Sequence, residues 1–141
     1  LPVLTSPASA NPAGTGLVIS EVYVNGGSAG ATYTNKFIEL YNPTNAAISL
    51  SGLSLQYRSA TGTGNASNVA VLSGSVPARG YFVVKGGSNG SNGSALPSSN
   101  LDATGINPAG GGGTLFLTTS RNATTPAGAI DAVGWGTSNA P

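Results

Sequence analysis

Short runs in which apolar and polar residues alternate recur along most of the chain. The clearest runs are residues 17–24, 36–41, 47–58, 69–72, 81–85, 114–119 and 129–135. Alternation with a period of two is typical of strands, because successive side chains point to opposite faces. No window of eleven residues holds an apolar stripe of helical spacing that is free of Gly and Pro. The pattern therefore predicts an all-β chain in which helix is nearly excluded.

Turn residues separate these runs. Asn25-Gly26 follows the first run, Asn42-Pro43 closes the second, and Gly52 divides the third. Glycine and asparagine accept the backbone angles of tight turns, and proline cannot continue a ladder of backbone hydrogen bonds. Seven or eight short strands with this punctuation are typical of a two-sheet β-sandwich.

The chain divides into a short arm and one domain. Residues 1–16 mix Pro, Ala, Ser and Thr without a strand period, which predicts a linker or an N-terminal arm on the surface. Residues 17–141 have the length of a single domain. The sequence starts at Leu1 without a signal peptide. We therefore expect the mature form or a piece of a larger secreted protein.

A long segment, residues 86–113, is rich in Gly, Ser and Asn and predicts a loop. Leu96, Leu101 and Ile106 are apolar residues spaced through it, so we expect at least partial packing against the domain. The four glycines at 110–113 are interpreted as a flexible linker, because no phosphate-binding motif or following helix accompanies them.

Composition excludes several kinds of site. The chain has no Cys, His or Met, so it can form no disulfide, no thiolate metal site and no Ser-His-Asp triad. Five basic and four acidic residues give a net charge of +1, which provides no long-range field toward nucleic acid or lipid. No apolar run approaches the ~20 residues that span a bilayer. A surface rich in hydroxyl and amide groups favours a secreted, extracellular protein.

Several runs taken together match a known pattern. Residues 19–23 read ISEVY, 36–43 read KFIELYNP and 48–52 read ISLSG, with further pieces at 55–57, 72–74, 77–82, 96–97, 102–105 and 131–136. In this order they resemble the lamin-tail domain family. The longer set is similar to a secreted bacterial branch of the family, which often accompanies extracellular nucleases. Two positions depart from the pattern: Lys36 stands where an acid is frequent, and Leu53 where Trp is common.

The resemblance implies an immunoglobulin-like two-sheet β-sandwich of seven to eight strands, with a binding or scaffolding role and no catalysis. We therefore expect a non-catalytic accessory domain of a secreted bacterial protein, without a cofactor. Its expected partners are other domains of that protein or a cell-surface polysaccharide. The exposed loops at 25–35, 58–68 and 86–113 are the expected contact surface.

Other functions remain open at this point. The main alternative is a nucleic-acid-binding accessory domain of an extracellular nuclease, which requires a basic stripe. The residues available for that stripe are Lys36, Arg58, Arg79, Lys85 and Arg121. A small glycoside hydrolase is a less favoured hypothesis. A spacer or self-associating unit is a purely structural one.

Glu21 and Glu39 are the clearest candidates for chemistry. The period of two places Glu21 on the side of Leu17 and Ile19, and Glu39 on the side of Phe37. If their strands are neighbours, two carboxylates lie close together on mostly apolar faces. Such a pair could serve glycoside cleavage or general acid–base catalysis. The structural alternative, which we favour, is hydrogen bonding to backbone or tyrosine, or pairing with a cation. The candidate cations are Lys36, Arg58 and Arg79.

The remaining acids are Asp102 and Asp131. With asparagine and backbone oxygens they could hold calcium, but no D-x-D-x-D spacing supports such a site. A capping role for Asp102 and a structural carboxylate for Asp131 are therefore the favoured interpretations. Trp135 and Tyr57 could form a platform on which a sugar or a base stacks, although a lone tryptophan in a small sandwich more often packs in the core.

Overall fold

The computed structural model describes residues 11–138, which contain ten strands. They are β1 (Val18–Tyr23), β2 (Phe37–Tyr41), β3 (Ile48–Ser49), β4 (Ser54–Ser59), β5 (Asn68–Val71), β6 (Ser75–Val76), β7 (Tyr81–Lys85), β8 (Leu101–Asp102), β9 (Gly112–Thr118) and β10 (Asp131–Gly136). Residues 11–138 contain no helix, and hence none that is long and apolar enough to cross a membrane. The all-β prediction is confirmed.

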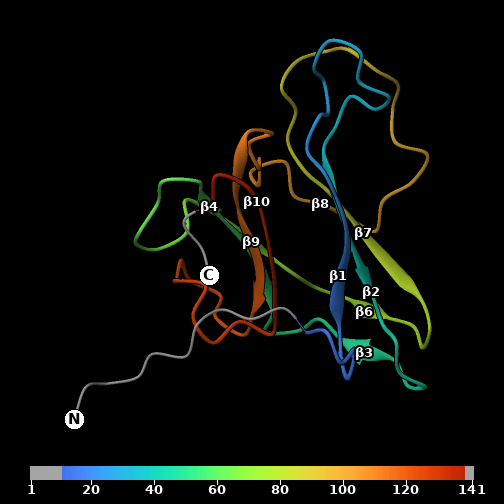
Figure 1. Cartoon of the computed structure of the whole chain (residues 1–141). Helices are drawn as coiled ribbons and strands as arrows, with labels where there is room; N and C mark the ends of the chain where they lie inside the picture. Colours follow the sequence, from blue (N-terminus) through green and yellow to red (C-terminus); the bar gives the residue numbers. More distant parts are fainter. Residues whose placement is uncertain (1–10, 139–141) are drawn as a thin grey trace.

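The strands form two four-stranded sheets that face each other (Figure 1). The first sheet has the order β1-β2-β7-β8, and the second sheet has the order β10-β9-β4-β5. A short ribbon of β3 and β6 accompanies them. Every strand pair is antiparallel except β7–β8, which is parallel. The predicted immunoglobulin-like sandwich is confirmed, and β6 and β8, each two residues long, add to the predicted strands.

The two sheets enclose one apolar core. Ile38 and Leu40 point inward from β2, and Leu115 and Leu117 point inward from β9; all four are fully buried. Burying such a side chain contributes roughly 1.5–3 kcal/mol relative to leaving it exposed. The alternate residues of each strand face away from this core. The two sheets differ in how deeply these outward residues are buried.

The outer face of the second sheet is covered over β4 and β9, whereas Val71 on the edge strand β5 is exposed. β9 is buried at all seven positions. Gln56 on β4 is fully buried, and its amide nitrogen donates to the carbonyls of Ser120 and Asn122 in the connection between β9 and β10. On the same side Phe116 packs with Ala132. By contrast, the outward residues of β2 in the first sheet are only half-buried, so that sheet keeps an accessible outer face.

β1 contains a bulge between Ile19 and Glu21. The extra residue shifts the alternation, so that Ile19 and Val22 both pack against the core and Glu21 turns to the exposed outer face. The predicted placement of Glu21 on the side of Leu17 and Ile19 is therefore wrong. The spacing of three between the apolar residues 19 and 22 was the signal of the bulge.

The segment 86–113 is tied to the fold at several points. It runs beside the loop 25–35, to which the isolated β-bridges Gly27–Asn92 and Tyr33–Ser94 connect it (Figure 1). Farther along, β8 pairs with β7, and Ile106 is fully buried in the core.

Gly112 and Gly113 are the first residues of β9, so the prediction of a flexible linker over 110–113 is wrong at these two positions. Both are buried, and their φ angles of 152° and 148° lie in a region that favours glycine. A Cβ atom at Gly113 would collide with the ring of Tyr57. The glycines are therefore needed where this ring packs against the strand.

Most of the predicted arm, residues 1–10, lies outside the described residues, as do the last three residues of the predicted domain, 139–141. From the rest of the arm, the backbone N–H of Asn11 donates to the carboxylate of Asp131 on β10, at 2.7 Å. The chain is thus already fastened to the sandwich at residue 11.

Candidate binding face on the first sheet

The outer surface of the first sheet collects aromatic and acidic side chains. β1, β2 and β7 contribute alternate residues to it, because the inward positions between them belong to the core. We call this surface the outer aromatic face. Its residues are Glu21 and Tyr23 of β1, Phe37, Glu39 and Tyr41 of β2, Tyr81, Val83 and Lys85 of β7, and Tyr33 from the loop before β2.

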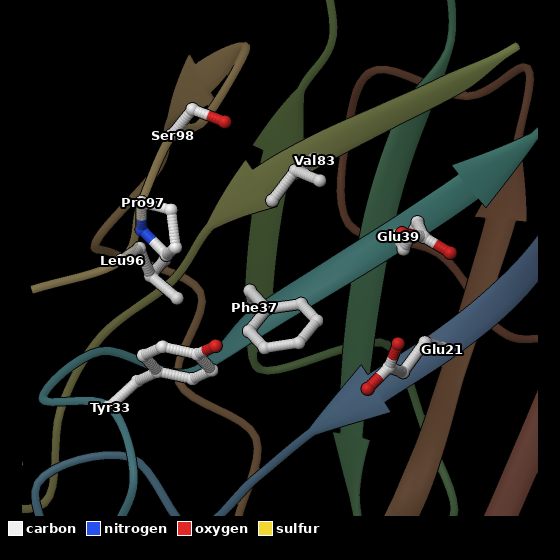
Figure 2. A pocket seen from close by; sticks show the side chains of 8 residues that line it. All are labelled: Glu21, Tyr33, Phe37, Glu39, Val83, Leu96, Pro97 and Ser98. Carbon is white, nitrogen blue, oxygen red and sulfur yellow. The ribbon is translucent and has the colours of Figure 1, made fainter.

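The two glutamates occupy the middle of this face. Glu21 lies directly opposite Glu39 in the β1–β2 register (Figure 2). A carboxylate oxygen of Glu39 accepts a hydrogen bond of 2.8 Å from the Ser20 hydroxyl. The single ion pair within residues 11–138 joins Lys85 to Asp102, so neither glutamate has a cationic partner there. Like charges directly opposite each other destabilise a strand pair. The repulsion between the two carboxylates therefore lowers the stability of the fold.

Three aromatic rings lie beside the glutamates. Tyr23 stacks on Phe37 with ring centroids 5.3 Å apart, and Tyr33 meets both edge-on at 5.8 and 6.2 Å. The Tyr23 hydroxyl accepts hydrogen bonds from the backbone N–H groups of Thr32 and Tyr33. These contacts hold the cluster in a defined arrangement, as edge-on and offset aromatic pairs do.

The Phe37 and Tyr33 rings and the two glutamates line a shallow pocket of about 160 Å³. Leu96, Pro97 and Ser98 form its far wall, and they come from the segment between β7 and β8 (Figure 2). The sequence predicted packing of Leu96 but gave no sign of this pocket. The wall is held beside the strands on two sides: the bridges to loop 25–35 precede it, and the hydrogen bonds of Asn100 to Val83 on β7 follow it.

A second group of rings lies farther along the same face. Tyr41 on β2 and Tyr81 on β7 are directly opposite each other, with ring centroids 4.8 Å apart. The side chain of Tyr81 is 57% exposed. The outer aromatic face therefore offers one aromatic group at each end and acidic groups between them.

The model of the Lamin Tail Domain family matches residues 10–137, which include every strand and the whole outer aromatic face. The chain belongs to the lamin tail domain family. The lamin tail domain is a non-enzymatic domain with an immunoglobulin-like fold, in agreement with the sandwich described above. No curated protein matches this chain.

In this lamin tail domain Asp131 lies away from the outer aromatic face, at the start of β10, and is buried. One carboxylate oxygen accepts the N–H of Asn11 and the other accepts the N–H of Ile19 on β1, both at 2.7 Å. Asp102, on β8, pairs at the surface with Lys85 at 3.5 Å. The structure does not bring the two aspartates together, and no three acidic side chains gather within residues 11–138 as a metal site would require.

Trp135 of the domain lies partly in the core. Its ring stacks on Tyr57 at 5.9 Å, and its indole N–H donates to the carbonyl of Ala109. Because Tyr57 is only 4% exposed, the two rings do not form an open stacking platform. The outer edge of Trp135 instead lines a groove of about 350 Å³ between β1 and β10, together with Val22 and Val133.

None of the three candidate cations contacts the glutamates of the domain. Lys36 is buried, with 2% of its surface exposed, and its Nζ donates to the carbonyl of Pro108 at 2.6 Å. Burial lowers the pKa of Lys36 from its ordinary value of 10.5, because it removes water from the ammonium group. Arg58 and Arg79 donate to a backbone carbonyl and to an asparagine side chain. The predicted pairing of the glutamates with these cations is therefore wrong.

Proposed function

We propose that this lamin tail domain is a non-catalytic accessory module of a secreted bacterial protein, and that it binds a cell-surface polysaccharide through the outer aromatic face. The observation that carries the proposal is the presence of accessible rings and acids on the outer face of the first sheet. On the outer face of the second sheet, the central strands β4 and β9 are buried. Accessible rings next to a few polar groups are typical of ligand sites. A surface rich in hydroxyl and amide groups supports secretion.

The dimensions of the face suit a chain of sugar rings. The pocket of about 160 Å³ is similar to the ~150 Å³ cavity that accommodates benzene in another protein, so it can hold one six-membered ring. Phe37 and Tyr41 are four residues apart on β2, or roughly 13 Å at ~3.3 Å per residue. A polymer lying along β2 can thus contact the rings at both ends. Between them, Glu21 and Glu39 can accept hydrogen bonds from hydroxyl groups.

Geometry weighs against a glycoside hydrolase. In such enzymes two carboxyl groups flank the scissile bond from different sides of the sugar. Here Glu21 and Glu39 lie side by side on one open face, and Glu21 is exposed. This arrangement supports binding of a sugar rather than cleavage of its glycosidic bond.

The test is binding of the domain to a panel of soluble cell-wall polysaccharides, followed by titration calorimetry on the best ligand. Tyr81→Ala and Tyr33→Ala should each weaken binding several-fold, which corresponds to ~0.5–1.5 kcal/mol for the loss of an aromatic contact. The matched control is Val71→Ala, because Val71 is also exposed, at 41%, but lies on β5 of the second sheet. This control should bind like the parent protein.

Two results would contradict the proposal. One is the absence of binding to every polysaccharide of the panel. The other is unchanged affinity in Tyr81→Ala and Tyr33→Ala together with a loss in Val71→Ala, because the ligand would then occupy the second sheet.

A further inference from the structure

The proposed function leaves the class of polysaccharide open, and the inference made here rests on it. We infer that the outer aromatic face selects a polysaccharide whose sugars carry free, protonated amino groups. The observation is a pocket in which two carboxylates without a cationic partner border the Phe37 and Tyr33 rings (Figure 2).

The charge of the pocket is not balanced by the domain. Within residues 11–138 the Glu21 carboxylate has no hydrogen-bond or ion-pair partner, and Glu39 is contacted by the neutral Ser20 hydroxyl. Lys85, which lies opposite Phe37 on the same face, pairs with Asp102 instead of the glutamates, and Lys36 donates inward to the carbonyl of Pro108. A cationic ligand group placed between the two glutamates would relieve their repulsion and would gain two charge-assisted hydrogen bonds.

The rings add a second attraction for the same group. A cation within about 6 Å of an aromatic centroid is drawn to the face of the ring. Phe37 and Glu39 are on the same side of β2, two residues apart, and both line the pocket. An amino sugar can therefore stack its ring on the aromatic cluster while its ammonium group reaches the carboxylates.

The location of the pocket favours a polysaccharide over a basic peptide. An extended peptide gains much of its affinity from backbone hydrogen bonds to a free sheet edge. The pocket lies over β2, whose two edges are occupied by β1 and β7. The face consequently offers side chains alone, which suits a ligand that recognises rings and carboxylates.

The experiment compares three probes by calorimetry on the whole chain, at a pH where sugar amines are protonated. They are a β-1,4-linked glucosamine oligomer, the same oligomer fully N-acetylated, and oligolysine of equal charge. The glucosamine oligomer should bind about tenfold more tightly than the acetylated one, as expected for two partly exposed ion pairs with a ring contact. Added salt should reduce this preference.

The double variant Glu21→Gln/Glu39→Gln should lose the preference and retain binding of the acetylated oligomer, because glutamine has the size of glutamate and keeps one acceptor oxygen. Val71→Ala is the control, since Val71 lies on the second sheet and its replacement leaves every charge of the first sheet in place. This control should preserve the tenfold difference. If the double variant does not fold, the test is whether added salt reduces the preference of the parent protein for the glucosamine oligomer.

The outcomes separate this inference from the proposed function. Equal affinity for both oligomers overturns the amine preference and leaves polysaccharide binding in place. Binding of oligolysine without binding of either oligomer overturns both. Binding of a neutral polysaccharide from the panel, with none of the three probes bound, overturns the amine preference alone.

Discussion

Lys36 carries its ammonium group into the interior just before β2 begins. Its backbone is tied to the same region, because its N–H donates to the carbonyl of Gly87, whose own N–H donates to the carbonyl of Ile106. With the bond from Nζ to Pro108, this residue joins the start of β2 to the segment that leads into β9. The same burial that makes this connection lowers the pKa of the lysine.

This lowered pKa has a consequence for stability. Because the unfolded chain binds the Lys36 proton more tightly than the folded chain, the free energy of unfolding should increase as pH rises from the folded pKa to 10.5. One proton limits the slope to about 1.4 kcal/mol per pH unit. Lys36→Met removes the titrating group. The unfolding free energy of the parent protein minus that of Lys36→Met, measured in urea, should therefore rise with pH.

Lys36→Arg is the matched control for this prediction. A guanidinium group stays charged throughout the range, so its contribution does not change with pH. The difference in unfolding free energy between Lys36→Arg and Lys36→Met should stay constant with pH, because the two variants share all other titrating groups. A constant difference between the parent protein and Lys36→Met would contradict the lowered pKa.

At the scale of elements, Asp131 fastens three parts of the chain. It starts β10, the edge of the second sheet, and accepts the backbone N–H of Ile19 on β1, the edge of the first sheet. Its other oxygen accepts the N–H of Asn11. A single carboxylate thus links the two sheets where neither has a further strand, and holds the residues that precede β1.

Asp131→Asn should lower the free energy of unfolding by roughly 2–4 kcal/mol. Asparagine has one acceptor oxygen for two N–H groups, and its amide nitrogen would face a donor. Asp102→Asn is the control, because its carboxylate is 64% exposed and pairs with Lys85 at 3.5 Å. This control should cost less than ~1 kcal/mol, as surface pairs do. Equal losses in urea unfolding of the two variants would argue against the fastening role of Asp131.

The strands of this domain could largely be predicted from the sequence. One face of each strand packs in the core and the other does not, so apolar and polar residues alternate along it. The spacing of three between the apolar residues Ile19 and Val22 also carries a signal of the bulge that turns Glu21 outward. Local pattern could not indicate the register that sets Glu21 opposite Glu39, or the burial of Lys36. Both depend on contacts with residues far along the chain, such as Pro108, and a period of two carries no information about those contacts.

The pocket shows the same limit. Its wall at Leu96 and Pro97 comes from a low-complexity segment whose path is set by bridges to loop 25–35 and by the hydrogen bonds of Asn100 to Val83. Predicting that this loop and segment 86–113 form a contact surface identified the region, but not the fact that they meet. These long-range contacts, rather than the composition of either segment, create the pocket.

At the scale of the whole molecule, the two outer faces differ in character. The connection between β9 and β10 covers the middle of the second sheet and satisfies the buried Gln56 amide through backbone groups. The first sheet leaves its rings and glutamates accessible. Binding through the first sheet is therefore compatible with other domains packing elsewhere, as a module of a larger protein requires.

The cations of the domain do not form a stripe. Lys36 is interior, Arg79 precedes β7, and Lys85 ends the same strand. Arg58 and Arg121 belong to opposite ends of the β4–β9 pair, in which Ser59 is level with Gly113 and Ser54 with Thr118. At most two of these cations can therefore face one stretch of duplex. This distribution weighs against the nucleic-acid-binding alternative.

The nucleic-acid alternative can be tested by the salt dependence of DNA binding. Each phosphate contact contributes about −0.9 to the slope of log K against log salt concentration. Two contacts give a slope of about −2, so we expect weak association of duplex DNA at low salt and none at physiological salt, measured by fluorescence anisotropy. A slope of about −4 or steeper would require at least four simultaneous phosphate contacts. Since Lys36 is interior and the other four cations are divided between opposite ends of their sheets, that result would mean that DNA rearranges the domain.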